Sequence, residues 1–211
     1  MKTGRSFLLL LNGELRELAT VKKLARRADA VICADGGARH AKALGLVPDC
    51  IVGDMDSLPR PLPRSWKRTT YVCDFDADRS DLDKALDFSE SAGASRVWIA
   101  GALGGGLDHE LVNLAALEVR RGKMGLTVIG GGVARLLGPG RHVLDLRRGE
   151  RFSLLAAPRA RATLTGARYP LRGELLARGS RGLGNRAEGR VVLSIRGGRV
   201  WLAVDAARFR G

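Results

Sequence analysis

The first 130 residues alternate between short aliphatic runs and segments with helical periodicity. The aliphatic runs predict strands at 7–11, 30–34, 50–52, 71–73, 96–100 and 126–129. Apolar residues at helical spacing predict helices at 14–28, 38–44, 80–92 and 107–121. Strands that alternate with helices build a parallel sheet covered on both faces. We therefore predict an α/β fold, with a Rossmann-like domain over residues 1–130.

The pattern changes after Gly130, where strand-like runs are separated by glycine, proline and arginine. These runs lie at 141–146, 151–156, 162–165, 191–195 and 200–204. We find no further helix of useful length. A chain of 211 residues is long enough to form two domains. We expect residues 131–211 to form a smaller antiparallel β-sandwich domain.

Arginine dominates the charge of this second part. Residues 131–211 contain 17 arginines, no lysine and five acidic residues, and so carry most of the net charge of +14. Such a charge can attract nucleic acid or a smaller anion. The arginines are scattered along the sequence, which favours the attraction of an anionic substrate. We therefore predict no nucleic-acid partner.

The cysteines and the apolar runs indicate the cellular compartment of the protein. Cys33, Cys50 and Cys73 lack CxxC spacing, and each lies in an apolar strand-like run, so we expect buried free thiols in a reducing compartment. The run at 7–11 is too short for a signal peptide. No segment approaches the roughly 20 apolar residues of a membrane span. We expect a soluble, cytoplasmic protein with no membrane partner.

Five aspartates lie where predicted strands end or the next helix begins: Asp35, Asp54, Asp56, Asp81 and Asp108. The carboxyl ends of parallel strands share one edge of the sheet, where ligands collect. Carboxylates gathered there repel one another unless a cation lies between them. A hard divalent ion such as Mg²⁺, carrying the phosphates of a nucleotide, suits oxygen ligands of this kind. The pattern favours phosphoryl or pyrophosphoryl transfer.

The alternative for each aspartate is a local structural role. Asp54 and Asp56 are two residues apart, so both carboxylates can reach one cation, but aspartate also favours solvated turns. Ser80 and Asp83 fit a helix N-cap and its partner. Asp81 lies between them, and it belongs either to this helix start or to the cluster.

A glycine-rich bridge over residues 101–106 links a predicted strand to a predicted helix. Its backbone N–H groups could bind a phosphate. It has neither the Walker A lysine nor GxGxxG spacing, so neither of those nucleotide motifs is present. His109, just beyond it, is either a catalytic or a surface histidine.

Four segments, taken in order, resemble the motifs of the thiamine pyrophosphokinase family, also called thiamine diphosphokinase. They read ADGGA at 34–38, PDCIVGDMDS at 48–57, ADRSD at 77–81, and GGGLDH at 104–109 followed by Asn113. The resemblance is dense from Asp35 to Asn113 and thin beyond Gly130. It implies transfer of pyrophosphate from ATP to the hydroxyl of thiamine with the help of Mg²⁺, which yields thiamine diphosphate and AMP.

The resemblance also implies roles for particular residues. The catalytic residues would be Asp54, Asp56, Asp81 and Asp108, and the metal ligands Asp35, Asp54, Asp56 and Asp81. The ATP site would use Asp35, Gly36, Gly37, Asp78, Arg79, Ser80, Gly104, Gly105, His109 and Asn113. Thiamine would be held by Ser180, Gly182, Asn185 and Trp201, although Trp201 also suits a protein core. The β domain would complete the site of a second chain, in a homodimer with shared active sites.

Two departures from the family pattern leave alternatives open. Gly106 stands where the family has an arginine, for which Arg79 or Arg39 could substitute. Leu183 and Gly184 stand where the family has hydroxyl side chains. One alternative is a pyrophosphokinase that acts on another alcohol, such as hydroxymethylpterin. The other is a non-enzymatic protein that binds polyanions.

Overall fold

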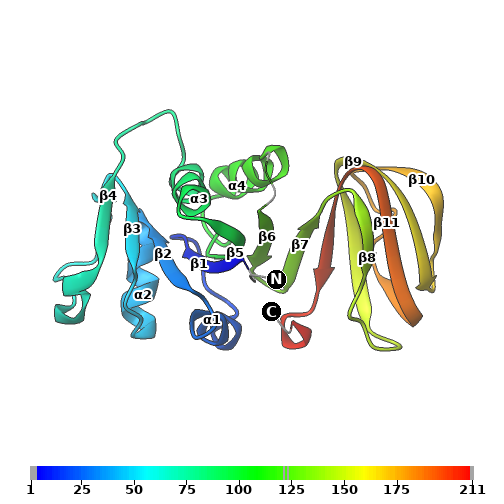
Figure 1. Cartoon of the computed structure of the whole chain (residues 1–211), viewed down its shortest axis with the longest axis horizontal. Helices are drawn as coiled ribbons and strands as arrows, with labels where there is room; N and C mark the ends of the chain where they lie inside the picture. The colour runs from blue at the N-terminus through cyan, green and yellow to red at the C-terminus, as the bar shows by residue number, and fades with distance from the viewer. Residues whose placement is uncertain (1–3, 121, 123, 210–211) are drawn as a thin grey trace. The chain divides into compact units, whose positions relative to one another are not determined.

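The computed structural model describes residues 4–120, 122 and 124–209. The chain divides into two compact units, the first ending at Gly131 and the second beginning at Gly132. The first is an α/β unit and the second is built of β-strands, which is the predicted fold class (Figure 1). In the part of the chain that is described, no helix has the length and apolar character needed to cross a membrane.

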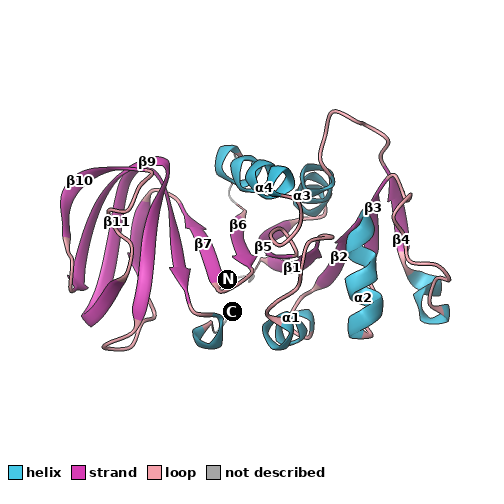
Figure 2. Cartoon of the chain, turned by 180° about the vertical axis from the view of Figure 1, so that it is seen from behind, coloured by secondary structure: helices cyan, strands magenta, loops and turns pink. Residues whose placement is uncertain are grey.

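The first unit contains a six-stranded parallel sheet in the order β6-β5-β1-β2-β3-β4. Figure 2 distinguishes its strands from the helices that cover it. The strands are β1 (Arg5–Leu10), β2 (Ala30–Ala34), β3 (Cys50–Gly53), β4 (Thr70–Cys73), β5 (Ala94–Ala100) and β6 (Gly125–Ile129). The helices are α1 (Leu18–Ala25), α2 (Ala38–Leu44), α3 (Asp81–Ser91) and α4 (Leu107–Val119), with short 3-10 helices η1 (Asp35–Gly37) and η2 (Arg64–Arg68).

The strand order reverses direction between β1 and β5. The chain moves from β1 through β2 and β3 to β4, returns through α3 to β5, and continues outward through α4 to β6. Right-handed crossovers then place α1 and α2 on one face and α3 and α4 on the other, as Figure 1 and Figure 2 show. The region beyond the carboxyl ends of β1 and β5 is the switch point at which such sheets bind ligands.

The core of this sheet explains why its strands were visible in the sequence. β2 is buried at every position, and so is β1 after Arg5. A parallel strand covered on both faces needs apolar residues throughout, instead of in alternation. Strands of this kind stand out as continuous aliphatic runs, such as the leucines of β1.

Two helices have bounds that differ from the predicted ones. The helix predicted at 14–28 is shorter, because the chain bends at Asn12 and Gly13 and the Glu14 N–H donates to the Gly104 carbonyl (3.2 Å). The helix α1 begins only at Leu18. The helix α4 ends at Val119, and its predicted end at residue 121 lies outside the described residues.

The second unit consists of five strands around one apolar core that includes Phe152, Leu154 and Leu193. Its strand order is β10-β9-β11-β7, with β8 also paired to β11. From Val192 to Val204 the partners on β9 descend from Thr165 to Phe152, which is an antiparallel register. The strands are β7 (Val133–Leu137), β8 (Gly140–Val143), β9 (Arg151–Ala167), β10 (Leu171–Ala177) and β11 (Asn185–Val204), followed by the 3-10 helix η3 (Ala206–Arg208).

The strand predictions for this unit were partly wrong. β7 and β10 were missed, and the runs at 151–156 and 162–165 belong to the single strand β9. Pro158 suggested a break between them. Its missing N–H is tolerated because the pairing with β11 passes from Ala157 directly to Ala160, which leaves Pro158 in a bulge.

One cysteine is also placed differently from the prediction. Cys33 and Cys50 are buried free thiols, and burial raises the pKa of the Cys50 thiol to about 11. Cys73 is exposed instead. It lies on β4, the last strand in the order of this sheet, where one side has no neighbouring strand to cover it.

Gly37 fixes the close approach of η1 to β1, and we predict that Gly37→Ala destabilises the protein. An added Cβ would overlap the carbonyl oxygen of Leu10, which is backbone and cannot turn away. Overpacking of this kind costs about 1–3 kcal/mol, measurable by urea unfolding. Gly125→Ala is the control, because its Cβ would meet nothing closer than 3.7 Å. Equal effects of the two substitutions would contradict this packing argument.

Candidate active site

The ends of β2 and β3 bring Asp35, Asp54 and Asp56 together. Asp35 follows β2 directly and Asp54 follows β3 directly. One carboxylate oxygen from each of the three lies within 4.8 Å of the other two. Oxygens that share a divalent cation lie at most about 5 Å apart, since each is 2.0–2.6 Å from the ion. The three carboxylates are therefore close enough to bind one ion.

The carboxylate of Asp35 is buried without full hydrogen bonding. The residue is 3% exposed, and its Oδ1 has no hydrogen-bond partner in the described part of the chain. A buried and unpaired carboxylate oxygen is costly. A bound cation would give this oxygen a partner of opposite charge. The donors are oxygen atoms only, which fits Mg²⁺ better than softer metals.

The backbone around the cluster adopts unusual conformations to hold this geometry. Asp35 has φ 35° and Met55 has φ 70°, both in the left-handed region that non-glycine residues rarely adopt. Gly53 has φ 150°, and a Cβ there would lie 2.7 Å from the Cβ of Asp35. Strain of this kind persists where the surrounding structure fixes it, often at functional sites.

The turn after β3 is held by its own polar groups. Asp54 Oδ1 accepts the Asp56 N–H (3.3 Å), and Asp56 Oδ1 accepts the Ser57 hydroxyl (2.8 Å). Arg39 donates from Nε to the Ser57 carbonyl oxygen (3.1 Å). Arg39 therefore supports this turn, and it does not line the cavity described next.

A cavity of about 490 Å³ opens at the switch point, between the ends of the central strands and helices α3 and α4. This volume lies in the range of small-molecule sites. Of the predicted residues, its wall includes Asp35, Gly36, Asp54, Arg79, Ser80, Asp81, Gly105, His109 and Asn113. The residues predicted for the metal, ATP or catalysis that lie outside the wall are Gly37, Asp56, Asp78, Gly104 and Asp108. Asp56 still belongs to the carboxylate cluster, whereas Asp108 is exposed on the first turn of α4.

Asp81 adds a fourth carboxylate to the field of the cluster. It is the first residue of α3, and Ser80 caps this helix by accepting the Asp83 N–H (3.2 Å), as predicted. Burial raises the pKa of Asp81, and repulsion from Asp35 raises it further, while Lys84 lowers it. The negative charge of Asp35 therefore makes the ionisation of Asp81 less favourable.

The pKa of Asp35 is raised for similar reasons. Burial is the main cause, the nearby Ser57 hydroxyl opposes it, and repulsion from Asp54 and Asp56 adds to it. A raised pKa means that the ionised form is disfavoured, so a proton competes with a metal ion at higher pH than at an exposed aspartate. Metal binding at this cluster should therefore weaken as the pH falls.

The glycine-rich bridge after β5 is organised by two side chains of α4. Gly104 donates its N–H to Glu110 Oε1 (2.7 Å), and Asn113 donates from Nδ2 to the Ala102 carbonyl (2.9 Å). One of the backbone N–H groups expected to bind phosphate is thus bound by a carboxylate. The helix N-cap is Gly106, which offers no capping side chain.

Several residues of the cavity wall were missed in the sequence, among them Asn12, Lys84 and Glu110. Asn12 directly follows the strand predicted at 7–11, so its position at a strand end was a usable signal. Lys84 comes three residues after Asp81 on the same helix, a spacing that places both on one face. Glu110 gave no signal, because its contact with Gly104 depends on the fold of the glycine-rich bridge.

The residues predicted to hold thiamine lie in the second unit. Ser180 is exposed, and the Gly182 carbonyl accepts the Leu154 N–H (2.9 Å). Trp201 is buried, at 6% exposure.

The Asn185 side chain is buried and has defined partners. Its Oδ1 accepts the Tyr169 N–H (3.0 Å) and the Arg186 N–H (2.9 Å), while Nδ2 donates to the Tyr169 carbonyl (2.8 Å). It therefore fixes the turn between β9 and β10, whatever else it binds.

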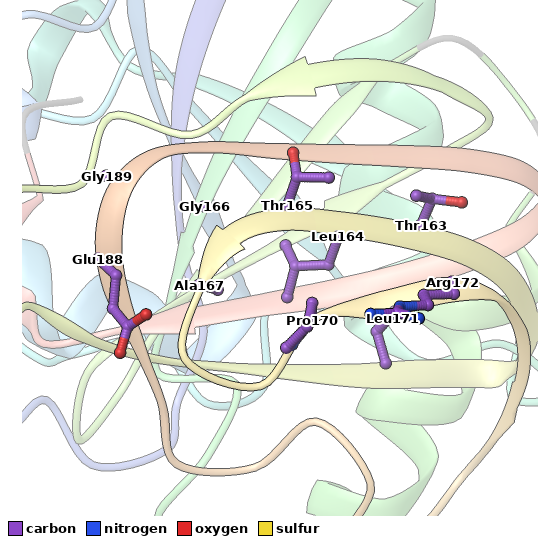
Figure 3. Close-up of a pocket in the computed structure, with 10 residues that line it drawn as sticks. All are labelled: Thr163, Leu164, Thr165, Gly166, Ala167, Pro170, Leu171, Arg172, Glu188 and Gly189. Carbon is purple, nitrogen blue, oxygen red and sulfur yellow. The ribbon is translucent and has the colours of Figure 1, made fainter.

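A second cavity, of about 630 Å³, lies within the β unit (Figure 3). Thr163, Thr165 and Leu164 form part of its wall, with Glu188 near one end and Arg172 near the other. None of the four residues predicted to hold thiamine lines it. It contains no cluster of acidic residues, so the first cavity is the better candidate for the reaction.

A carboxylate cluster at the switch point of a parallel sheet is typical of enzymes that transfer phosphoryl groups. The thiamin pyrophosphokinase catalytic domain matches residues 21–128, and the chain belongs to this family of transferases. No match is found among curated proteins.

Solved structures share the fold. The chain is similar to thiamine pyrophosphokinase from Bacillus subtilis, with 20% identity over 95% of this chain and 99% of that one and a TM-score of 0.75. It is similar to thiamin pyrophosphokinase from Geobacillus thermodenitrificans, with 22% identity over 95% and 97% of the two chains and a TM-score of 0.72. The enzyme from Candida albicans gives 16% identity over 96% and 90%, with a TM-score of 0.74. At these identities the likeness concerns the fold.

We predict that Asp54→Asn weakens the binding of a divalent cation at least about tenfold, the scale of one lost charged ligand. Titration of the protein with Mn²⁺, followed by electron paramagnetic resonance, measures this affinity without any turnover. Glu17→Gln is the control, because Glu17 precedes α1 and its side chain makes no capping bond. If both variants bind Mn²⁺ as the wild type does, the cluster is not a metal site.

Proposed function

We propose that this site transfers the pyrophosphoryl group of ATP to the hydroxyl of thiamine with the help of Mg²⁺. The products are thiamine diphosphate and AMP. The observation that supports this proposal most is the cluster of the buried Asp35 with the exposed Asp54 and Asp56 at the switch point, where one oxygen of Asp35 has no partner among the described residues. Membership of the family supports thiamine as the acceptor.

The acidic residues at the cavity would have separate roles in metal binding and proton transfer. Asp35, Asp54 and Asp56 would hold Mg²⁺, with Asp81 as a further ligand or as a neighbour of the bound ion, because Mg²⁺ seldom takes more than a few carboxylates. When bound, the ion would neutralise the charge that develops on the transferred group. Where Asp81 does not ligate the ion, its raised pKa makes it the better base for the proton of the attacking hydroxyl.

The glycine-rich bridge would approach the phosphates. Gly105 and Gly106 line the cavity and carry no side chains, so the polyphosphate can come close to the backbone there. The N–H of Gly104 would be released to a phosphate only if Glu110 turns away. Glu110 and a phosphate oxygen are thus competitors for the same donor.

We further propose that residues 1–130 act as the domain that binds ATP and Mg²⁺. Residues 131–211 would contribute to thiamine binding and to dimerisation, with active sites shared between two chains. The family resemblance supports this division, and the arginine content of the second part would help to attract anionic substrates.

The identity of the acceptor is the part of the proposal for which a specific alternative exists. Leu183 and Gly184 replace the two hydroxyl side chains of the family pattern. A pterin alcohol as acceptor would use the same ATP site and the same metal cluster. The choice of acceptor therefore needs its own experiment.

We expect AMP to form from ATP only when thiamine and Mg²⁺ are both present, with one thiamine diphosphate for each AMP. The protein is incubated with ATP and separate candidate acceptors, and nucleotides are separated by ion-exchange chromatography. Excess EDTA should abolish AMP formation. ADP as the product would contradict pyrophosphoryl transfer, and AMP formed only with hydroxymethylpterin would replace the acceptor. Salt-sensitive nucleic-acid binding without turnover would favour a polyanion-binding protein.

A further inference from the structure

Lys84 is a buried lysine in the wall of the candidate active site. It is 6% exposed, lies on α3 and lines the cavity of about 490 Å³. Its Nζ donates to the carbonyl oxygen of Asp74 (2.9 Å). Burial disfavours an ammonium group, so a buried lysine is expected only where other groups stabilise its charge. Here the stabilising charge comes from the acidic side of the cavity, since Lys84 interacts with Asp81.

The other basic side chains near the cavity have acidic partners or lie outside it. Arg79 lines the cavity, but its guanidinium forms ion pairs with Asp87 and with Asp74 (3.6 Å). Arg39 supports the turn after β3 from outside the wall. Among the described ion pairs, none joins Lys84 to a carboxylate within 4.0 Å. Its positive charge therefore remains available to an anion.

The charge of the substrate requires such a group. A nucleoside triphosphate brings about four negative charges to a cavity whose wall already includes five acidic residues, Asp35, Asp54, Asp76, Asp81 and Glu110. One divalent ion cannot balance both sets. Position 106, a glycine, offers no side chain for this purpose. Lysine is a compact, movable point charge that commonly binds phosphate oxygens.

We propose that Lys84 is a substrate-binding residue whose ammonium group contacts the polyphosphate chain of the nucleotide. The bond to the Asp74 carbonyl holds the side chain in place and leaves two N–H donors for phosphate oxygens. Lys84 thus supplies the positive charge that the glycine at position 106 does not supply. This inference rests on the proposed function, because it assumes a nucleotide with several phosphates in this cavity.

Two binding measurements distinguish phosphate binding from a merely structural role. The affinity of Mg-ATP is measured by calorimetry, and the affinity of Mn²⁺ alone by electron paramagnetic resonance. Lys84→Met should weaken Mg-ATP binding about tenfold, the scale of one charged hydrogen bond. It should leave Mn²⁺ binding unchanged or tighter, because a positive charge near the cluster has been removed. Lys84→Gln, which keeps a donor for the Asp74 carbonyl, should show the same pattern, and Lys84→Arg should retain most of the Mg-ATP affinity.

Lys42→Met is the matched control. Lys42 also donates from Nζ to a backbone carbonyl at 2.9 Å, that of Pro61, but it is exposed and lies outside the cavity. It should bind both ligands as the wild type does.

The inference is overturned if Lys84→Met and Lys84→Gln, or the one of them that folds, bind Mg-ATP with wild-type affinity. It is also overturned if they lose Mn²⁺ and Mg-ATP equally, since that result means that Lys84 only supports the shape of the site. A wild-type protein that binds Mn²⁺ but no Mg-ATP would instead refute the proposed function.

Discussion

The repulsion among carboxylates at the ends of β2 and β3 is the constraint on which the rest of this structure depends. Asp35 is buried beside Asp54 and Asp56, and one of its oxygens has no partner among the described residues. A fold that served stability alone would not keep this arrangement, because each charge raises the cost of the others. Its presence is explained if a cation and a polyphosphate complete the site.

The architecture of the first unit supplies what this arrangement needs. The sheet reverses its strand order between β1 and β5, which leaves open space beyond the strand ends. Gly53 lets the third strand approach Asp35 closely, and the left-handed backbone of Asp35 itself directs the carboxylate inward. The central strands β1, β2 and β3 are almost completely buried, and their packing stabilises the fold against the cost of strain and charge at these few residues.

The sequence predicted most of the first unit and less of the second, for physical reasons. Buried parallel strands are continuous aliphatic runs, and α2 and the capped start of α3 were predicted to the residue. In the β unit, the long strand β9 passes through Pro158 by way of a bulge, so local rules for strand breaks failed. The aspartates of the cluster were visible because they follow strands directly. Glu110 was not, since its contact with Gly104 depends on the fold of the glycine-rich bridge.

Comparison of the wild type with Asp35→Asn, without metal, tests the central claim most directly. Asparagine tolerates the left-handed backbone of Asp35, so the substitution removes the charge without adding strain. The folded-state pKa of Asp35 is raised above its ordinary value of 3.8, so the ionised group destabilises the metal-free fold above that raised pKa. We predict that Asp35→Asn has the higher free energy of unfolding at neutral pH, that this advantage shrinks as the pH falls toward 3.8, and that Mg²⁺ stabilises the wild type more than the variant. A metal-free Asp35→Asn variant that is less stable than the wild type at neutral pH would contradict this account.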